Sequence, residues 1–215
     1  MSNRRSFCVS LAACSSLSWS AAASEKLIDG TAYRLLPPSF RLNGLAMDPP
    51  PSDNFEEARL LYSMQQVRTS TQVEAIQQQN ENPVPLFWLC AGLNERDFPT
   101  WSAYVNEAVL DTESVLLYFK KLFNRPRPTA VLPAIQPPVP VPWHAAYPSG
   151  HATQAVVIAS LLAKLSPKAG RDLMNFALEV GRNREVAGLH YPSDTGMGIK
   201  LGKQLAEIFL PLSPS

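Results

Sequence analysis

The sequence predicts an all-α fold, built as a single helical-bundle domain. Apolar residues recur at helical spacing through several long segments, and no segment of useful length alternates between apolar and polar residues as a strand would. Apolar residues make up 46% of the 215 residues and charged residues 17%, which is enough to form one hydrophobic core of ordinary size. These proportions exclude a wholly disordered chain.

Residues 1–23 have the features of an export signal that is removed from the mature protein. Arg4 and Arg5 form a basic start, a mostly apolar stretch follows, and three alanines at 21–23 provide a small-residue cleavage site. The paired arginines also resemble a bacterial twin-arginine signal. A lipoprotein signal with Cys14 as the lipidated residue is the alternative. We therefore expect a periplasmic or secreted protein.

The mature chain begins with an irregular arm. Residues 24–52 are rich in proline and predict an extended segment, whereas residues 53–215 predict the folded domain. Asp53 provides a helix-capping residue with an acidic residue three positions later, and helical spacing continues to about Gln79. The polar run at 69–71 favours a break within this helical region.

Two segments that begin at prolines follow. Residues 83–93 form a short apolar segment, and residues 99–121 carry apolar residues at helical spacing. The second of these must end before Pro126 and Pro128, because proline cannot continue a helix. Residues 122–148 then form a long proline-rich loop, and loops of this length in compact domains are usually functional or disordered.

Three further helices are predicted in the C-terminal part of the chain. The first spans residues 149–165, with Ser149 as its N-cap. The second spans residues 166–186 and has Pro167 at its first helical position. Proline is favoured there because an N–H at that position has no partner within the helix. The third spans residues 192–209.

Charge, hydropathy and cysteine usage argue against a nucleic-acid-binding protein, a membrane-spanning protein and a disulfide-bonded protein. The formal net charge is +1, from 19 Lys and Arg against 18 Asp and Glu, so no overall field favours nucleic acid or an anionic membrane surface. The most apolar mature segment, residues 155–165, is far shorter than the roughly 18 residues of a membrane-spanning helix. Cys90 is the one cysteine outside the predicted signal, so we expect no internal disulfide. The sequence leaves open whether the protein forms a homo-oligomer.

The first cluster of chemically active residues lies where the 99–121 helix meets the long loop. Lys120 falls on the last turn of that helix, and Arg127 follows seven residues later in a segment that flanking prolines hold extended. Such a pair of cations is usually a solvated surface, but it also offers positive charge to an anion.

The second cluster is the run Pro148-Ser149-Gly150-His151 at the predicted start of a helix. Ser149 can cap the helix, and Gly150 lets a ligand approach the backbone closely. Free N–H groups and the helix dipole make such a terminus a ready site for an anion. An ordinary cap with an incidental histidine is the alternative.

The third cluster contains Arg184, His190 and Asp194. If Pro192 begins a helix, His190 and Asp194 lie close together across its first turn. A carboxylate that accepts the Nδ1–H of histidine fixes the tautomer and leaves Nε2 free as a nucleophile. A purely structural His–Asp hydrogen bond is the alternative.

Together the three clusters resemble the three-part phosphatase motif of the type 2 phosphatidic acid phosphatase (PAP2) superfamily. The matching runs, in chain order, are Lys120-x6-Arg127-Pro128, Pro148-Ser149-Gly150-His151 and Arg184-x5-His190-x3-Asp194. That superfamily includes bacterial class A non-specific acid phosphatases, membrane lipid phosphatases and vanadium-dependent haloperoxidases. Residues 55–130 also resemble the soluble acid phosphatases. One departure is Asn183, because the family usually has serine before the third-motif arginine.

The resemblance implies a role for each residue of the motif. His190 is expected to attack phosphorus, Asp194 to orient His190, and His151 to protonate the leaving oxygen and then to activate water. The residues expected to bind phosphate are Lys120, Arg127, Ser149, Gly150 and Arg184. This scheme needs no metal or other cofactor. The third histidine, His144, stands alone in the predicted loop, and we expect it near the mouth of the site.

The resemblance therefore implies an exported, metal-independent acid phosphatase that hydrolyses small phosphate monoesters through a phosphohistidine intermediate. A vanadium-dependent haloperoxidase, in which vanadate takes the phosphate position and binds His190, is an alternative that uses the same motif. A lipid phosphate phosphatase is another, although no membrane helices are predicted. A non-catalytic phosphate-binding protein is disfavoured, because every reactive residue is present.

Overall fold

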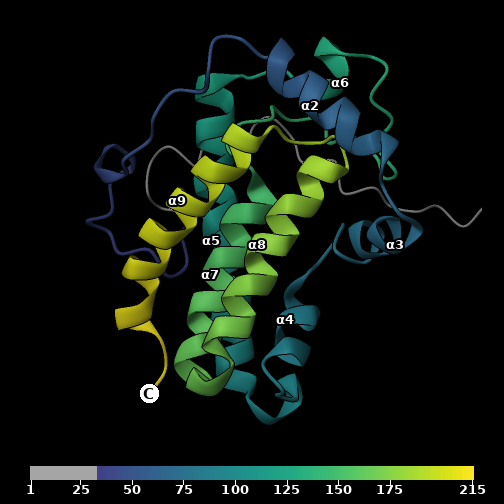
Figure 1. Ribbon diagram of the computed structural model, residues 1–215. Helices are drawn as coiled ribbons and strands as arrows, with labels where there is room; N and C mark the ends of the chain where they lie inside the picture. The colour runs from purple at the N-terminus through teal and green to yellow at the C-terminus, as the bar shows by residue number, and fades with distance from the viewer. Residues whose placement is uncertain (1–32) are drawn as a thin grey trace, which may run out of the picture.

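The computed structural model describes residues 33–215, and the predicted signal at 1–23 lies outside them. Within the described residues the regular structure is helical and contains no strand, which confirms the all-α prediction (Figure 1). The helices are α2 (Phe55–Gln66), α3 (Ser70–Gln78), α4 (Val84–Cys90), α5 (Pro99–Phe123), α6 (Pro128–Val131), α7 (Gly150–Leu165), α8 (Gly170–Val186) and α9 (Pro192–Phe209). Among these helices, none has both the length and the hydropathy that crossing a membrane requires.

The core is built around α7, which packs against α5, α8 and α9 (Figure 1). Small and branched apolar residues occur on every side of α7, as is typical of a helix buried in the centre of a protein. Two glycines let α9 approach α7 closely. A Cβ added at Gly198 would lie 2.7 Å from the backbone oxygen of Ser149, and one added at Gly202 would lie 2.7 Å from that of Thr153.

The predicted break near residues 69–71 is confirmed, because α2 ends before it and α3 begins within it. Thr69 and Gln72 form a capping box at the start of α3. The Thr69 hydroxyl accepts a hydrogen bond from the Gln72 N–H at 3.2 Å, and the Gln72 side chain accepts one from the Thr69 N–H at 2.9 Å. Helices α2, α3 and α6 then cover the end of the bundle where α8 stops (Figure 1).

The long loop between α5 and α7 is more ordered than a purely irregular connection. Asn124 ends α5 in the left-handed conformation, with φ of 43°. The single-turn helix α6 begins at Pro128, whose fixed φ suits the first position of a helix. The remainder of the loop returns to α5, where its last carbonyls contact Lys120.

The described part of the predicted arm is held by a buried carboxylate of α5. Asp111 accepts hydrogen bonds from the backbone N–H groups of Arg34, Leu35 and Leu36 at 2.7 to 2.9 Å. A carboxylate buried in this way is compensated by its three donors. The segment then runs along α9, where Lys200 pairs with Asp48 at 2.7 Å.

Candidate active site

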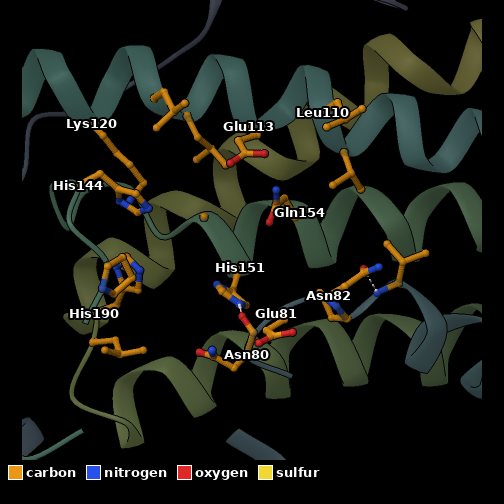
Figure 2. Close-up of a pocket in the computed structure, with 18 of the residues that line it drawn as sticks. Asn80, Glu81, Asn82, Leu110, Glu113, Lys120, His144, His151, Gln154 and His190 are labelled. Atoms are coloured by element: carbon orange, nitrogen blue, oxygen red, sulfur yellow. Dashed lines mark hydrogen bonds between the residues drawn. The ribbon is translucent and has the colours of Figure 1, made fainter. Parts of the chain in front are cut away.

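The three sequence clusters meet at one end of a cavity of about 460 Å³ (Figure 2). Lys120 comes from the last turn of α5, His151 from the first turn of α7, and His190 from the turn between α8 and α9. The ends of helices carry unpaired backbone groups and partial charges, so they are suited to binding ions. The fold thus gathers residues that are up to 70 positions apart in the sequence.

His190 is oriented by Asp194 from the first turn of α9. Its Nδ1 lies 3.2 Å from Asp194 Oδ2, which also accepts the Tyr191 N–H at 3.0 Å. Because the carboxylate only accepts, Nδ1 carries the proton and Nε2 keeps a lone pair. Burial lowers the pKa of His190 well below its ordinary value, and the cationic Arg127 and Lys120 lower it further. The ring is therefore neutral, as a nitrogen nucleophile must be.

Arg125 belongs to the site, although the sequence did not predict a role for it. Its NH1 lies 2.5 Å from Asp194 Oδ1, and its NH2 lies 2.6 Å from Glu57 of α2. The guanidinium also stacks on the Tyr191 ring at 3.9 Å. Burial raises the pKa of Asp194, and Arg125 opposes that rise. The only signal in the sequence was a second arginine two positions before Arg127.

Arg127 connects the long loop to His190. Its NH1 lies 3.1 Å from His190 Nε2 and donates to the Leu189 carbonyl at 2.9 Å. Its NH2 lies 2.9 Å from His144 Nδ1, so the histidine expected at the mouth of the site contacts a motif arginine directly. Burial lowers the pKa of Arg127 to about 10, and burial together with the charge of Lys120 lowers that of His144 to about 4.

Lys120 is a buried cation that is already fully hydrogen-bonded. Its ammonium group donates to the carbonyls of Ala145, Ala146 and Pro148 at 3.0, 3.1 and 2.7 Å. Because an ammonium has three protons, these bonds use all of them. Burial lowers the pKa of Lys120 well below its ordinary value. Lys120 therefore holds the end of the loop against α5 and contributes positive charge, while the loop carbonyls occupy all of its donors.

Arg184 and Ser149 carry three of the five buried side-chain polar atoms that lack a partner among the described residues, and the other two are on Trp88 and Tyr191. Arg184 donates from NH2 to the Ile76 carbonyl at 2.9 Å, but its buried Nε and NH1 have no partner among the described residues. The buried Ser149 hydroxyl also lacks a partner among them, so the prediction that its side chain caps α7 is wrong. Its backbone N–H instead donates to the Asp194 carbonyl at 3.0 Å. Unpaired buried donors are rare in proteins and indicate a missing acceptor.

His151 lies on the first turn of α7 and faces the cavity (Figure 2). Its Nε2 lies 3.0 Å from the Asn80 carbonyl, which can only accept, so the proton is on Nε2. Burial and then the charge of Arg184 lower the pKa of His151 to about 4. The ring is therefore neutral above about pH 4, and an anion bound beside it would raise its pKa.

Asn183, the departure from the family pattern, turns away from these groups. Its side-chain amide donates to Gln79 Oε1 at 3.0 Å, at the end of α3.

The side chains that could bind a metal ion are dispersed. The described part of the chain contains no group of three or more His, Cys, Asp or Glu side chains placed to hold an ion.

Comparisons with known proteins agree with this geometry. The chain is 32% identical over 122 residues to a decaprenylphosphoryl-5-phosphoribose phosphatase of Mycobacterium tuberculosis, a match that covers 56% of this chain and 58% of the relative. This chain therefore spans less than two thirds of that relative's length.

Two solved structures share the fold. A bacterial vanadium-dependent iodoperoxidase superposes with a TM-score of 0.64 at 17% identity, over 76% of this chain and 52% of that one. A transmembrane PAP2-type phosphatidylglycerolphosphate phosphatase from Bacillus subtilis superposes with a TM-score of 0.56 at 19% identity, over 73% of this chain and 84% of that one. Residues 101–212, which include all three clusters, match the PAP2 superfamily over more than half of the chain. The chain therefore belongs to the PAP2 superfamily.

Proposed function

We propose that this protein is an exported acid phosphatase that hydrolyses phosphate monoesters through a phosphohistidine on His190. The observation that carries the proposal is the set of buried donors without partners on Arg184 and Ser149, in a site whose histidine nucleophile is already oriented. Three donors that no described residue satisfies suit the equatorial oxygens of a phosphoryl group, on which the charge of the transition state is spread.

In the first step, His190 Nε2 attacks phosphorus and the bond from phosphorus to the ester oxygen breaks. Arg184, Ser149 and the Gly150 N–H hold the equatorial oxygens, and Arg127 moves its contact from Nε2 to the phosphoryl group. The Asp194 carboxylate stabilises the positive ring that forms. These donors are closed to solvent, so the wall must shift slightly as phosphate enters.

His151 supplies the proton that the leaving oxygen takes. The Asn80 carbonyl keeps one proton on Nε2, so the second proton, on Nδ1, is the one delivered. In the second step the neutral His151 accepts a proton from water, the water oxygen attacks phosphorus, and the bond from phosphorus to His190 Nε2 breaks. Inorganic phosphate leaves, His190 is neutral again, and His151 releases to solvent one proton, equal to the proton that it took up when the substrate bound.

A lipid phosphate is the second candidate substrate. The relative from Mycobacterium tuberculosis is named as a phosphatase of a decaprenylphosphoryl compound. In addition, Leu110 and Leu117 of α5 line the cavity, and Trp143 beside it is 85% exposed. Tryptophan is enriched where proteins contact a membrane surface.

One set of assays on the purified protein separates the candidates. Phosphate release is measured from a soluble alkyl phosphate and from a prenyl phosphate in mixed micelles, each with and without chelator. Halide oxidation by peroxide is measured with added vanadate. We expect turnover of the soluble ester at mildly acidic pH that chelator leaves unchanged. Halide oxidation without phosphatase activity would contradict the proposal, and turnover of the micellar substrate alone would favour the lipid candidate.

A further inference from the structure

The cavity does not end at the phosphate site but continues along α5. Its wall there is formed by residues that recur every three or four positions, which places them on one face of the helix. These residues are Asn106, Leu110, Glu113, Leu117 and Lys120. Glu113 lies seven residues before Lys120, so it is on nearly the same face and about 10 Å further along the helix axis.

The opposite wall brings polar groups to the same part of the cavity. Asn80, Glu81 and Asn82 come from the segment that precedes α4, and Gln154 comes from the turn of α7 that follows His151. Figure 2 shows Glu113 and Gln154 in the middle of the cavity, with His151 opposite Glu113, between His144 and His190 at one end and Leu110 and Asn82 at the other. A leaving group that extends from the phosphate would pass between these side chains.

Glu113 is a carboxylate without a counter-ion. Within residues 33–215 it takes part in no ion pair and no side-chain hydrogen bond, although it is half-buried. Burial raises its pKa. Glu81 lines the same part of the cavity, and the only Lys or Arg among the lining residues is Lys120 at the phosphate end. The cavity therefore has positive charge at one end and negative charge further along.

We propose that Glu113 is a specificity-determining residue of a leaving-group subsite, which takes phosphate monoesters whose leaving group carries an ammonium group. The cationic end of the cavity receives the phosphate and the carboxylate receives the ammonium, with the amides of Asn82, Asn106 and Gln154 available as further acceptors. A leaving group with a second negative charge is repelled. The inference rests on the proposed function, since it assigns the part of the substrate beyond the phosphate.

The test uses three esters that differ only at the far end of the leaving group: 6-aminohexyl phosphate, hexyl phosphate and 5-carboxypentyl phosphate. The reacting bond and the leaving alkoxide are the same, so differences in kcat/KM report the far end. We expect kcat/KM for 6-aminohexyl phosphate to exceed that for 5-carboxypentyl phosphate by about tenfold, with hexyl phosphate between them. The ratio is no larger because a partly solvated cavity weakens the interaction between charges. Added salt should reduce the ratio.

Glu113→Gln should bring the three kcat/KM values to within about twofold of one another. Glu107→Gln is the matched control, because it removes the same charge from the same helix at a position that does not line the cavity. It should preserve the order. The inference would be overturned if the wild-type protein showed equal kcat/KM values for the three esters, or if their ranking survived in Glu113→Gln.

A binding measurement keeps this test separate from the test of the proposed function. Calorimetric titration of the three esters into His190→Ala reports their affinities without turnover, and the same order is expected. If none of the esters is hydrolysed by the wild-type protein but the order of affinities depends on Glu113, the proposed function fails and the subsite stands. If all are hydrolysed and bound alike, the subsite fails and the proposed function stands.

Discussion

Arg125 and Arg184 are both buried cations near the proposed nucleophile, and they differ in what surrounds them. Arg125 is 3% exposed, and each of its three nitrogens contacts a polar side chain, including the carboxylates of Glu57 and Asp194. Arg184 is fully buried, yet it bonds a single carbonyl and leaves two nitrogens without a partner among the described residues.

The difference separates two functions of a buried charge. Taking a guanidinium out of water is costly unless a partner compensates it. The protein itself compensates Arg125, which therefore stabilises the fold and keeps Asp194 oriented toward His190. Nothing among the described residues neutralises Arg184, and we expect an anionic ligand to do so. The charge of Arg125 is thus balanced by the protein itself, whereas we expect the charge of Arg184 to be balanced by the bound ligand.

The largest loss of activity should follow from removing His190, the proposed nucleophile, which lies between the Arg125 network and Arg184. His190→Ala should lower turnover by a factor on the order of 10⁴ or more, because the covalent route is lost. Rapid acid-free quenching of enzyme with labelled substrate should trap a base-stable, acid-labile phosphoenzyme in the wild type and none in the variant. Label that persists in His190→Ala would place the nucleophile elsewhere.

Arg184→Met should cost activity without costing stability. We expect kcat/KM to fall by about 10²–10³-fold, since a preorganised donor to the transition state is lost. The melting temperature without anion should stay the same or rise, because an uncompensated charge is removed. In the wild type, sulfate at 100 times its Kd should add about 2.7 kcal/mol to the free energy of unfolding, and in the variant it should add far less. Equal stabilisation of both proteins by sulfate would contradict this assignment.

Arg125→Met should show the opposite pattern. It leaves the buried Asp194 and the half-buried Glu57 without their cation, so we expect the free energy of unfolding to fall by about 3 kcal/mol in urea titrations. Sulfate should still stabilise the variant. Arg125→Lys retains the charge without the planar fork and should lie between the two. A variant as stable as the wild type would show that the network does not support the fold.

The smallest effect concerns protons rather than rates. Burial lowers the pKa of His151 to about 4, and a bound dianion should raise it toward its ordinary value near 6.5. Between these two values, binding should take up as much as one proton. Calorimetry of sulfate binding at pH 5.5, in buffers of different ionisation enthalpy, measures this uptake. Sulfate is suitable because it does not titrate in this range.

His151→Asn should abolish that uptake, and His144→Asn is the matched control. His144 has the same lowered pKa of about 4, but it contacts Arg127 and lies on the loop side of the cavity. If uptake disappears in His144→Asn and persists in His151→Asn, the proton donor of the proposed mechanism is His144 instead.

The sequence by itself determined the helical class and most helix boundaries. Pro99 and Pro192 begin α5 and α9 as expected, because the fixed φ of proline favours the first helical turn whatever surrounds it. Helical spacing of apolar residues likewise predicted α7, since a helix that is apolar on one or all sides must bury that surface. The pairing of His190 with Asp194 follows from the same helix start, because Asp194 on the first turn of α9 lies next to the residues that directly precede Pro192.

Only the tertiary structure decided how the individual polar groups are used. Lys120 donates to carbonyls 25 to 28 residues away, and Arg125 pairs with Glu57 across 68 positions. Ser149, a good cap by residue type, leaves its hydroxyl unpaired. Helix propensity and capping act between near neighbours, so a sequence pattern can report them. Hydrogen-bond partners and pKa values depend instead on which distant atoms come within about 3 Å and on how much water the packed elements exclude.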